Sequence, residues 1–153
     1  MSKDTKEYFK VLKGLFDKII TTDASGRVLE LDKALDRAIE MIIKQATSGG
    51  KLMFIGNGAS AAISSHMAVD FWKNAGIKAI SFNDSSLLTC VSNDYGYKYV
   101  FEKPIEMFAK AGDCLIAISS SGKSENILRG TYAAKKKKVK VLTLSGFTQS
   151  NAL

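Results

Sequence analysis

From residue 51 onward, short apolar runs alternate regularly with amphipathic stretches of helical length, and this alternation limits the fold more than any other feature of the sequence. Alternating strands and helices are typical of parallel sheets, in which right-handed crossovers place helices on both faces. The spacing predicts strands near 51–55, 78–82, 114–118 and 139–144. It predicts helices near 60–74, 85–92, 99–110 and 124–137. The predicted fold class is therefore a three-layer α/β/α, doubly wound parallel sheet.

Two amphipathic segments precede the first predicted strand. Apolar residues at helical spacing run from Tyr8 to Ile20 and from Leu31 to Ala46, with a polar break over 21–27 between them. Gly49-Gly50 ends the second segment. We therefore expect two helices before any strand. The predicted organisation is a helical pair over 1–48 that serves oligomerisation, packed on an α/β domain over 49–153 as one structural domain.

Composition and charge exclude several classes of protein. The 153 residues are 46% hydrophobic and 24% charged, as in ordinary globular domains. No apolar stretch is long enough to span a membrane, and residues 1–7 lack the apolar core of a signal peptide, so we expect a cytoplasmic protein without a membrane partner. Cys90 and Cys114 have no metal-like spacing and are interpreted as free thiols.

The net charge of +7 favours anionic ligands. The lysine run at 135–138 is interpreted as a solvated helix end, and no nucleic acid partner is expected.

Two polar loops follow predicted strands at the points where helices begin. Residues 56–60 read Gly-Asn-Gly-Ala-Ser, and residues 119–124 read Ser-Ser-Ser-Gly-Lys-Ser. Backbone N–H groups and hydroxyls at a helix N-terminus are suited to binding an anion. Because the carboxyl ends of parallel strands share one edge of the sheet, both loops should reach the same ligand.

Three interpretations of these loops are possible. Residues 56–61 fit the dinucleotide fingerprint G-x-G-x-x-A, with Asp84 as a ribose acid, but this leaves the serine-rich loop without a role. Residues 117–124 resemble a P-loop whose first glycine is replaced by Ala117. A sugar-phosphate pocket uses all four serine hydroxyls and needs no nucleotide cofactor. A simpler alternative, in which Ser124 only caps its helix, accounts for one serine of the four.

His66 and Asp70 form a possible functional pair on the helix after the first loop. Their i, i+4 spacing puts them side by side, away from a predicted sheet-packing face that includes Ala61, Ala68 and Trp72. The spacing alone favours an exposed ion pair over half of a metal site or a proton-transfer pair. Asn93 and Asp94 either form a turn or lie at the ligand edge, and their spacing does not decide between the two.

Together these blocks resemble the sugar isomerase (SIS) domain of phosphoheptose isomerases. The resemblance rests on residues 56–60, on His66 with Asp70, on Val-Ser-Asn-Asp-Tyr-Gly at 91–96 and on residues 118–124, and it extends over about 49–146. It implies a sheet in flavodoxin-like order. It also implies a homotetramer, with active sites between subunits and the leading helices in the assembly.

The resemblance implies the interconversion of sedoheptulose 7-phosphate and a heptose 7-phosphate through an enediol. In this reaction a base acts on the C1–C2 hydrogens and an acid acts on the oxygens. It implies that His66 and Asp70 are catalytic residues and zinc ligands. It also implies a set of substrate-binding residues, to which we add Ser60 because its hydroxyl belongs to the first loop. That set is Asn57, Gly58, Ala59, Ser60, Asn93, Asp94, Ser119, Ser120, Ser121 and Ser124.

The chain departs from the family pattern at three points. Asp70 stands in place of a glutamate and Ala59 in place of a glycine. The family's last strand and helix are absent, and with them a glutamine and a histidine that complete the zinc site, so only a partial zinc site is expected. The alternative to an isomerase is a non-catalytic sugar-phosphate-binding SIS module, either a regulatory sensor or an adaptor for a replication initiator.

Overall fold

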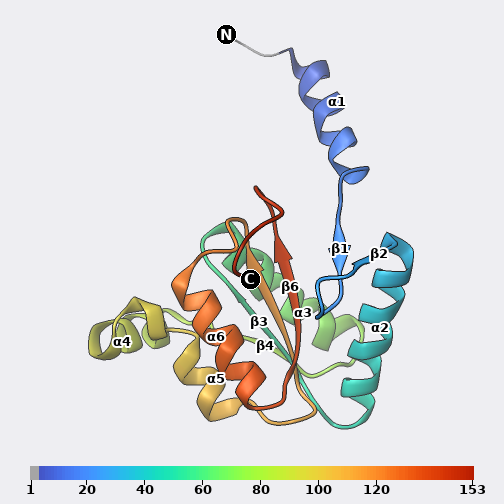
Figure 1. Cartoon of the computed structure of the whole chain (residues 1–153). Helices are drawn as coiled ribbons and strands as arrows, with labels where there is room; N and C mark the ends of the chain where they lie inside the picture. The colour runs from blue at the N-terminus through green and yellow to red at the C-terminus, as the bar shows by residue number, and fades with distance from the viewer. Residues whose placement is uncertain (1–3) are drawn as a thin grey trace. The chain divides into compact units, whose positions relative to one another are not determined.

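Four parallel strands form the main sheet of the structure, a computed structural model that describes residues 4–153 (Figure 1). They are β3 (Leu52–Gly56), β4 (Ala79–Ser81), β5 (Cys114–Ser119) and β6 (Lys140–Ser145). Their order in the sheet is β4-β3-β5-β6, which agrees with the expected flavodoxin-like order. The α/β fold and its parallel sheet are thus confirmed, and each predicted strand lies within two residues of its expected bounds.

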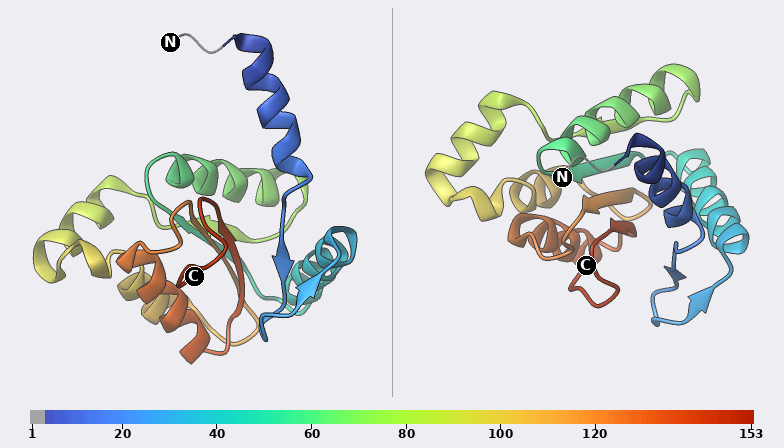
Figure 2. Two further views of the ribbon diagram at one scale, coloured as in Figure 1. Left: turned by 45° about the horizontal axis from the view of Figure 1, so that its top comes forward. Right: turned by 90° about the horizontal axis from the view of Figure 1, so that it is seen from above.

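Helices cover both faces of this sheet (Figure 2). Alternate residues of β3 point to opposite sides, because successive side chains of a strand alternate. Leu52 and Phe54 pack with α3 (Ala59–Asn74) and with Met41 and Ile42 of α2 (Leu31–Thr47). Met53 and Ile55 face the larger cluster, which is covered by α5 (Glu102–Phe108) and α6 (Glu125–Lys136).

The segment between β4 and α5 is more broken than the sequence predicts. After α4 (Ser85–Tyr95), a short 3-10 helix η1 (Tyr97–Tyr99) precedes α5, where a single helix over 99–110 was expected. Gly96, at a φ of 94°, separates α4 from η1. Val100 and Phe101 between η1 and α5 are buried in the larger cluster, so packing fixes this irregular turn.

The chain divides into two compact units, Met1–Glu40 and Met41–Leu153, with the division inside α2. The first unit contains α1 (Thr5–Phe16) and a hairpin of β1 (Thr21–Thr22) and β2 (Val28–Leu29), followed by the start of α2. The expectation of two helices before any strand is therefore wrong. The prediction that residues 1–7 lack the apolar core of a signal peptide falls partly on residues 1–3, which lie outside the described residues.

The hairpin has a local physical cause. The run Ile19-Ile20-Thr21-Thr22 consists of β-branched residues, which favour extended backbone over helix. The turn is held by Asp23, whose Oδ1 accepts from the backbone N–H groups of Ser25 (2.9 Å) and Arg27 (3.1 Å). Hydrogen bonds from Ser25, with further help from Arg27, lower the pKa of Asp23 to about 2. Helix α1 consequently ends at Phe16 instead of continuing to Ile20.

One residue assigned to the buried face of α3 is exposed. Ser64 and Ala68 are buried and Phe71 packs on the sheet, but Trp72 is 53% exposed. The buried stripe follows positions i, i+4 and i+7, and Trp72 is turned about 100° away from Phe71 on the helix. No helix among residues 4–153 is long and apolar enough to cross a membrane.

Candidate functional site

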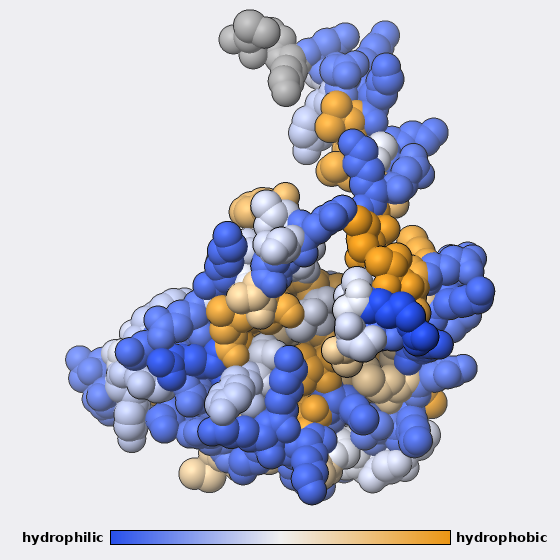
Figure 3. Space-filling view, viewed as in Figure 1, coloured by the Kyte–Doolittle hydropathy of each residue, from blue (hydrophilic) through white to orange (hydrophobic). Residues whose placement is uncertain are grey.

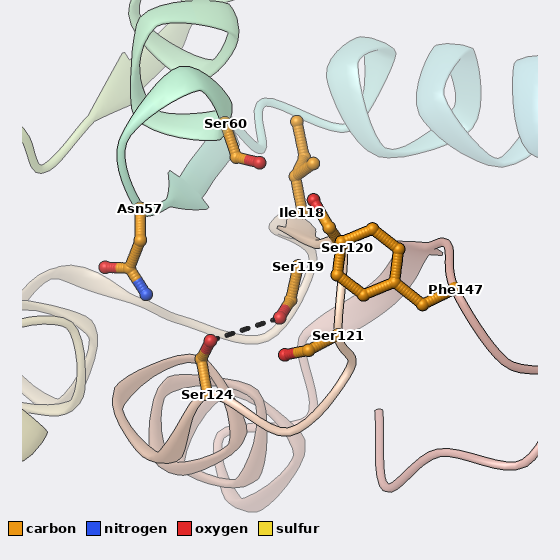
Figure 4. A pocket seen from close by; sticks show the side chains of 8 residues that line it. All are labelled: Asn57, Ser60, Ile118, Ser119, Ser120, Ser121, Ser124 and Phe147. Carbon is orange, nitrogen blue, oxygen red and sulfur yellow. Dashed lines mark hydrogen bonds between the residues drawn. The ribbon is translucent and has the colours of Figure 1, made fainter. Parts of the chain in front are cut away.

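The loops after β3 and β5 surround one cavity (Figure 4). The two strands are neighbours in the sheet, with Gly56 opposite Ile118, so both loops leave the same edge. The cavity measures about 190 Å³ and is lined by Asn57, Ser60, Ile118, Ser119, Ser120, Ser121, Ser124 and Phe147. That volume is below the roughly 300–1,000 Å³ of drug-sized ligand pockets and suits a small group such as a phosphoryl.

Two glycines shape the first loop. A Cβ at Gly56 would lie 2.6 Å from the backbone of Ser60, so only glycine lets α3 begin this close to its strand. Gly58 precedes α3 at a φ of 56° and ψ of −122°, a backbone conformation that residues other than glycine rarely adopt. Asn57 and Ser60 project into the cavity, whereas Gly58 and Ala59 contribute backbone at the start of the helix.

The serine loop forms a tight turn before α6. The N–H of Gly122 donates to the carbonyl of Ser119 (2.9 Å), and the N–H of Lys123 donates to Oγ of Ser121 (3.2 Å). Ser124 occupies the N-cap position of α6, but its side chain makes no capping hydrogen bond. Its Oγ instead accepts from Oγ of Ser119 (3.3 Å), as the dashed line in Figure 4 marks. Helix capping therefore does not account for Ser124, and its hydroxyl is available on the cavity wall.

The predicted residues Asn93 and Asp94 lie in the last turn of α4 and are not among the residues that line the cavity. Asn93 Nδ2 donates to Asp94 Oδ1 (3.0 Å), and Oδ2 of Asp94 lies 3.6 Å from Sγ of Cys90. The hydrogen bond and charge of Asp94 raise the pKa of the Cys90 thiol. The link from this turn to the cavity is Tyr97, whose hydroxyl donates to Oδ1 of Asn57 (3.1 Å).

His66 and Asp70 form the predicted pair, with 3.3 Å between Nε2 and Oδ2. Neither residue lines the serine-loop cavity. Asp70 instead lines a separate, open depression on α3 together with Met67, Phe71, Asn74 and Ala75. The exposed fraction of the His66 side chain is 75% and that of the Asp70 side chain is 38%, so the histidine is largely open to solvent and the carboxylate is partly covered.

The residues present do not form a complete zinc site. Within residues 4–153, no three His, Cys, Asp or Glu side chains lie close enough together to hold a metal ion. His66 and Asp70 supply two donors, whereas zinc in proteins usually has four ligands.

Four residues of the site were not identified from the sequence, one of which is Ile118 near the end of β5. Asn126 is 4% exposed and exchanges two hydrogen bonds with Asn57. Tyr97 reaches the same amide from η1, and Phe147 lines the cavity from the segment after β6. A polar residue on the buried side of a helix, two positions after Ser124, is the signal that could have pointed to Asn126. Tyr97 and Phe147 carry no comparable signal.

Comparison with known proteins places these features in a family. The SIS domain model matches residues 7–146. The chain is 38% identical over 132 residues to the phosphoheptose isomerase of Proteus mirabilis, covering 81% of this chain and 69% of that protein. It is 40% identical over 118 residues to that of Tolumonas auensis, covering 74% of this chain and 62% of the relative. The structure of the phosphoheptose isomerase of Neisseria gonorrhoeae aligns with a TM-score of 0.72 at 33% identity, covering 76% of this chain and 64% of that one.

Proposed function

The chain belongs to the SIS domain family, among the phosphoheptose isomerases, and from this premise we propose that it interconverts sedoheptulose 7-phosphate and a heptose 7-phosphate. The observation that carries the proposal is the cavity in which Asn57 and Ser60 face four serine hydroxyls. The chain spans 62–69% of the length of the two sequence relatives above, and the activity of a whole isomerase is part of this proposal.

In this proposal the serine loop holds the phosphoryl group. Hydroxyls of Ser121 and Ser124 donate to its oxygens, while Ser119 donates to Oγ of Ser124, and the N-terminus of the 12-residue helix α6 adds its positive dipole end. Lys123 follows in the same loop and is exposed, so its charge adds to the attraction of an anion without closing the cavity.

The isomerisation itself needs a base that removes a proton from C1 of the ketose and returns it to C2, and an acid that exchanges the proton between the two oxygens. We assign the base to Asp70 and its orientation to His66, which lies 3.3 Å away. Because the pair lies outside the cavity lining, we propose that it acts on substrate held in the cavity of a neighbouring subunit.

We also propose a homotetramer, because a site completed by a neighbouring subunit requires an assembly and because α1 exposes apolar side chains that could form one. Helix α1 carries no buried residue, and its apolar side chains are exposed, among them Phe9 (60%) and Phe16 (66%). Orange patches among the blue side chains of α1 are visible in Figure 3. Exposed apolar surface of this kind marks an interaction surface. Zinc, if bound, would require ligands in addition to His66 and Asp70.

Incubation of the chain with sedoheptulose 7-phosphate, followed by detection of the aldose product, tests the proposal. We expect turnover that Asp70→Asn removes, with binding of the sugar phosphate retained. Thermal stabilisation by sedoheptulose 7-phosphate without any turnover would contradict the isomerase. It would instead support a sugar-phosphate-binding module, which the separation of the His66–Asp70 pair from the cavity also favours.

A further inference from the structure

The side-chain amide of Asn57 is held by hydrogen bonds from two other segments of the chain. Asn57 Nδ2 donates to Oδ1 of Asn126 (3.0 Å), and Asn126 Nδ2 donates back to Oδ1 of Asn57 (2.9 Å). The hydroxyl of Tyr97 donates to the same Oδ1 of Asn57 (3.1 Å). The β3–α3 loop, the first turn of α6 and η1 therefore meet at one amide group.

The orientation of this amide follows from a backbone contact. The N–H of Ile127 donates to Oδ1 of Asn126 (3.0 Å). A backbone N–H can only donate, so the atom of the Asn126 amide that it contacts must be the oxygen, and the NH₂ group of Asn126 must face Oδ1 of Asn57. Asn126 is 4% exposed, and a buried amide that reversed its donors and acceptor would leave these partners unsatisfied.

Asn57 consequently offers only one kind of group to the cavity. Its oxygen already accepts from Tyr97 and Asn126, which uses both lone pairs. One of its two N–H bonds is used by Asn126, and the other remains. Figure 4 shows the amide nitrogen on the side of Ser119 and Ser124, with the oxygen turned away from them.

We infer that Tyr97 and Asn126 are positioning residues that lock Asn57 as an N–H donor to a phosphoryl oxygen of the ligand. The inference rests on the proposed function, because it deepens the recognition of a sugar phosphate in the same cavity. A freely rotating amide would present its oxygen to the phosphoryl group for part of the time, and two acceptors would then face each other. Tyr97 is the better of the two to change, since it is 54% exposed and belongs to neither core cluster.

Tyr97→Phe removes the hydroxyl and keeps the ring. With one hydrogen bond lost, we expect the Kd for inorganic phosphate and for sedoheptulose 7-phosphate to rise about 3- to 10-fold. KM should rise by the same factor while kcat stays within about twofold, since binding and not proton transfer is affected. The matched control is Tyr132→Phe, which removes another exposed phenol hydroxyl, one outside the cavity lining, and should leave Kd unchanged.

A double-mutant cycle separates the lock from a general structural effect. If Tyr97 acts through the amide, Tyr97→Phe should have no further effect on Kd in an Asn57→Ala background. An equal loss in both backgrounds, or no loss in the wild-type background, overturns the inference, and melting without ligand checks that each variant is folded. Inorganic phosphate keeps this test independent of catalysis. A wild-type chain that binds phosphate without isomerising the sugar contradicts the proposed enzyme. The double-mutant cycle still shows, in that case, whether Tyr97 acts on phosphate binding through the Asn57 amide.

Discussion

At the scale of single residues, Asp113 is a buried carboxylate whose contacts join three parts of the chain. Its carboxylate is fully buried before β5 and accepts from the backbone N–H groups of Lys51 (3.0 Å) and Lys110 (2.9 Å), and from the Lys51 ammonium. Burial raises the pKa of Asp113, but hydrogen bonds from Lys51 and Lys110, together with the charge of Lys51, outweigh it and hold the pKa below the ordinary 3.8. Asp113→Asn should therefore lower the free energy of unfolding at pH 7 by about 1–3 kcal/mol, measured by chemical denaturation.

The sign of the pH dependence follows from the lowered pKa. The contribution of Asp113 is fully present above pH 3.8 and is lost as the pH falls through the folded-state value below it. The stabilities of wild type and Asp113→Asn should thus converge in acid. Asp36→Asn, which changes an exposed carboxylate, is the control and should have little effect. Equal stabilities of wild type and Asp113→Asn at pH 7 would show that the buried contacts contribute nothing net.

At the scale of secondary structure elements, the N-termini of α4 and α6 make a natural comparison. Asp84 caps α4 by accepting from the N–H of Leu87 (3.0 Å), whereas Ser124 at the same position of α6 makes no capping bond. Ser124→Ala should therefore cost α6 less stability than the typical loss of about 1 kcal/mol on removing a cap, while raising the Kd for inorganic phosphate about tenfold. Asp84→Ala should lower the stability by about 1 kcal/mol and leave the Kd for inorganic phosphate unchanged. Thermal unfolding and calorimetric titration measure both, and a destabilised Ser124→Ala with unchanged Kd would reduce Ser124 to a structural role.

At the scale of the whole molecule, the exposed apolar residues of α1 predict self-association. Phe9→Ser together with Phe16→Ser replaces two of its largest exposed side chains and should lower the mass of the assembly measured by light scattering, without unfolding the Met41–Leu153 unit. Lys10→Ser and Lys13→Ser change the same helix without removing apolar surface and should leave the mass unchanged. A monomeric wild type would refute the proposed assembly.

Features that depend on local sequence patterns could be predicted from the sequence, whereas contacts between distant residues could not. The parallel sheet and the meeting of the two loops could be predicted, because apolar runs locate the strands and parallel strands end at one edge. The β1–β2 hairpin could not, since strands of two residues are too short to show alternation. The hydrogen bonds that join Asn57 to Tyr97 and Asn126 span 40 and 69 residues, and nothing in the local pattern pairs them. The role of the His66–Asp70 pair stays a prediction.

The pairing of β3 with β5 also has a consequence for how the cavity comes into being. Leu52 lies opposite Cys114 and Gly56 opposite Ile118, so each half of the cavity is contributed by a strand that must find a distant partner. Such non-local pairing forms late and slowly when a chain collapses from the denatured ensemble. A phosphate ester therefore has no binding site until β3 and β5 have paired. It should slow unfolding, by holding the finished sheet, and leave the rate of refolding unchanged.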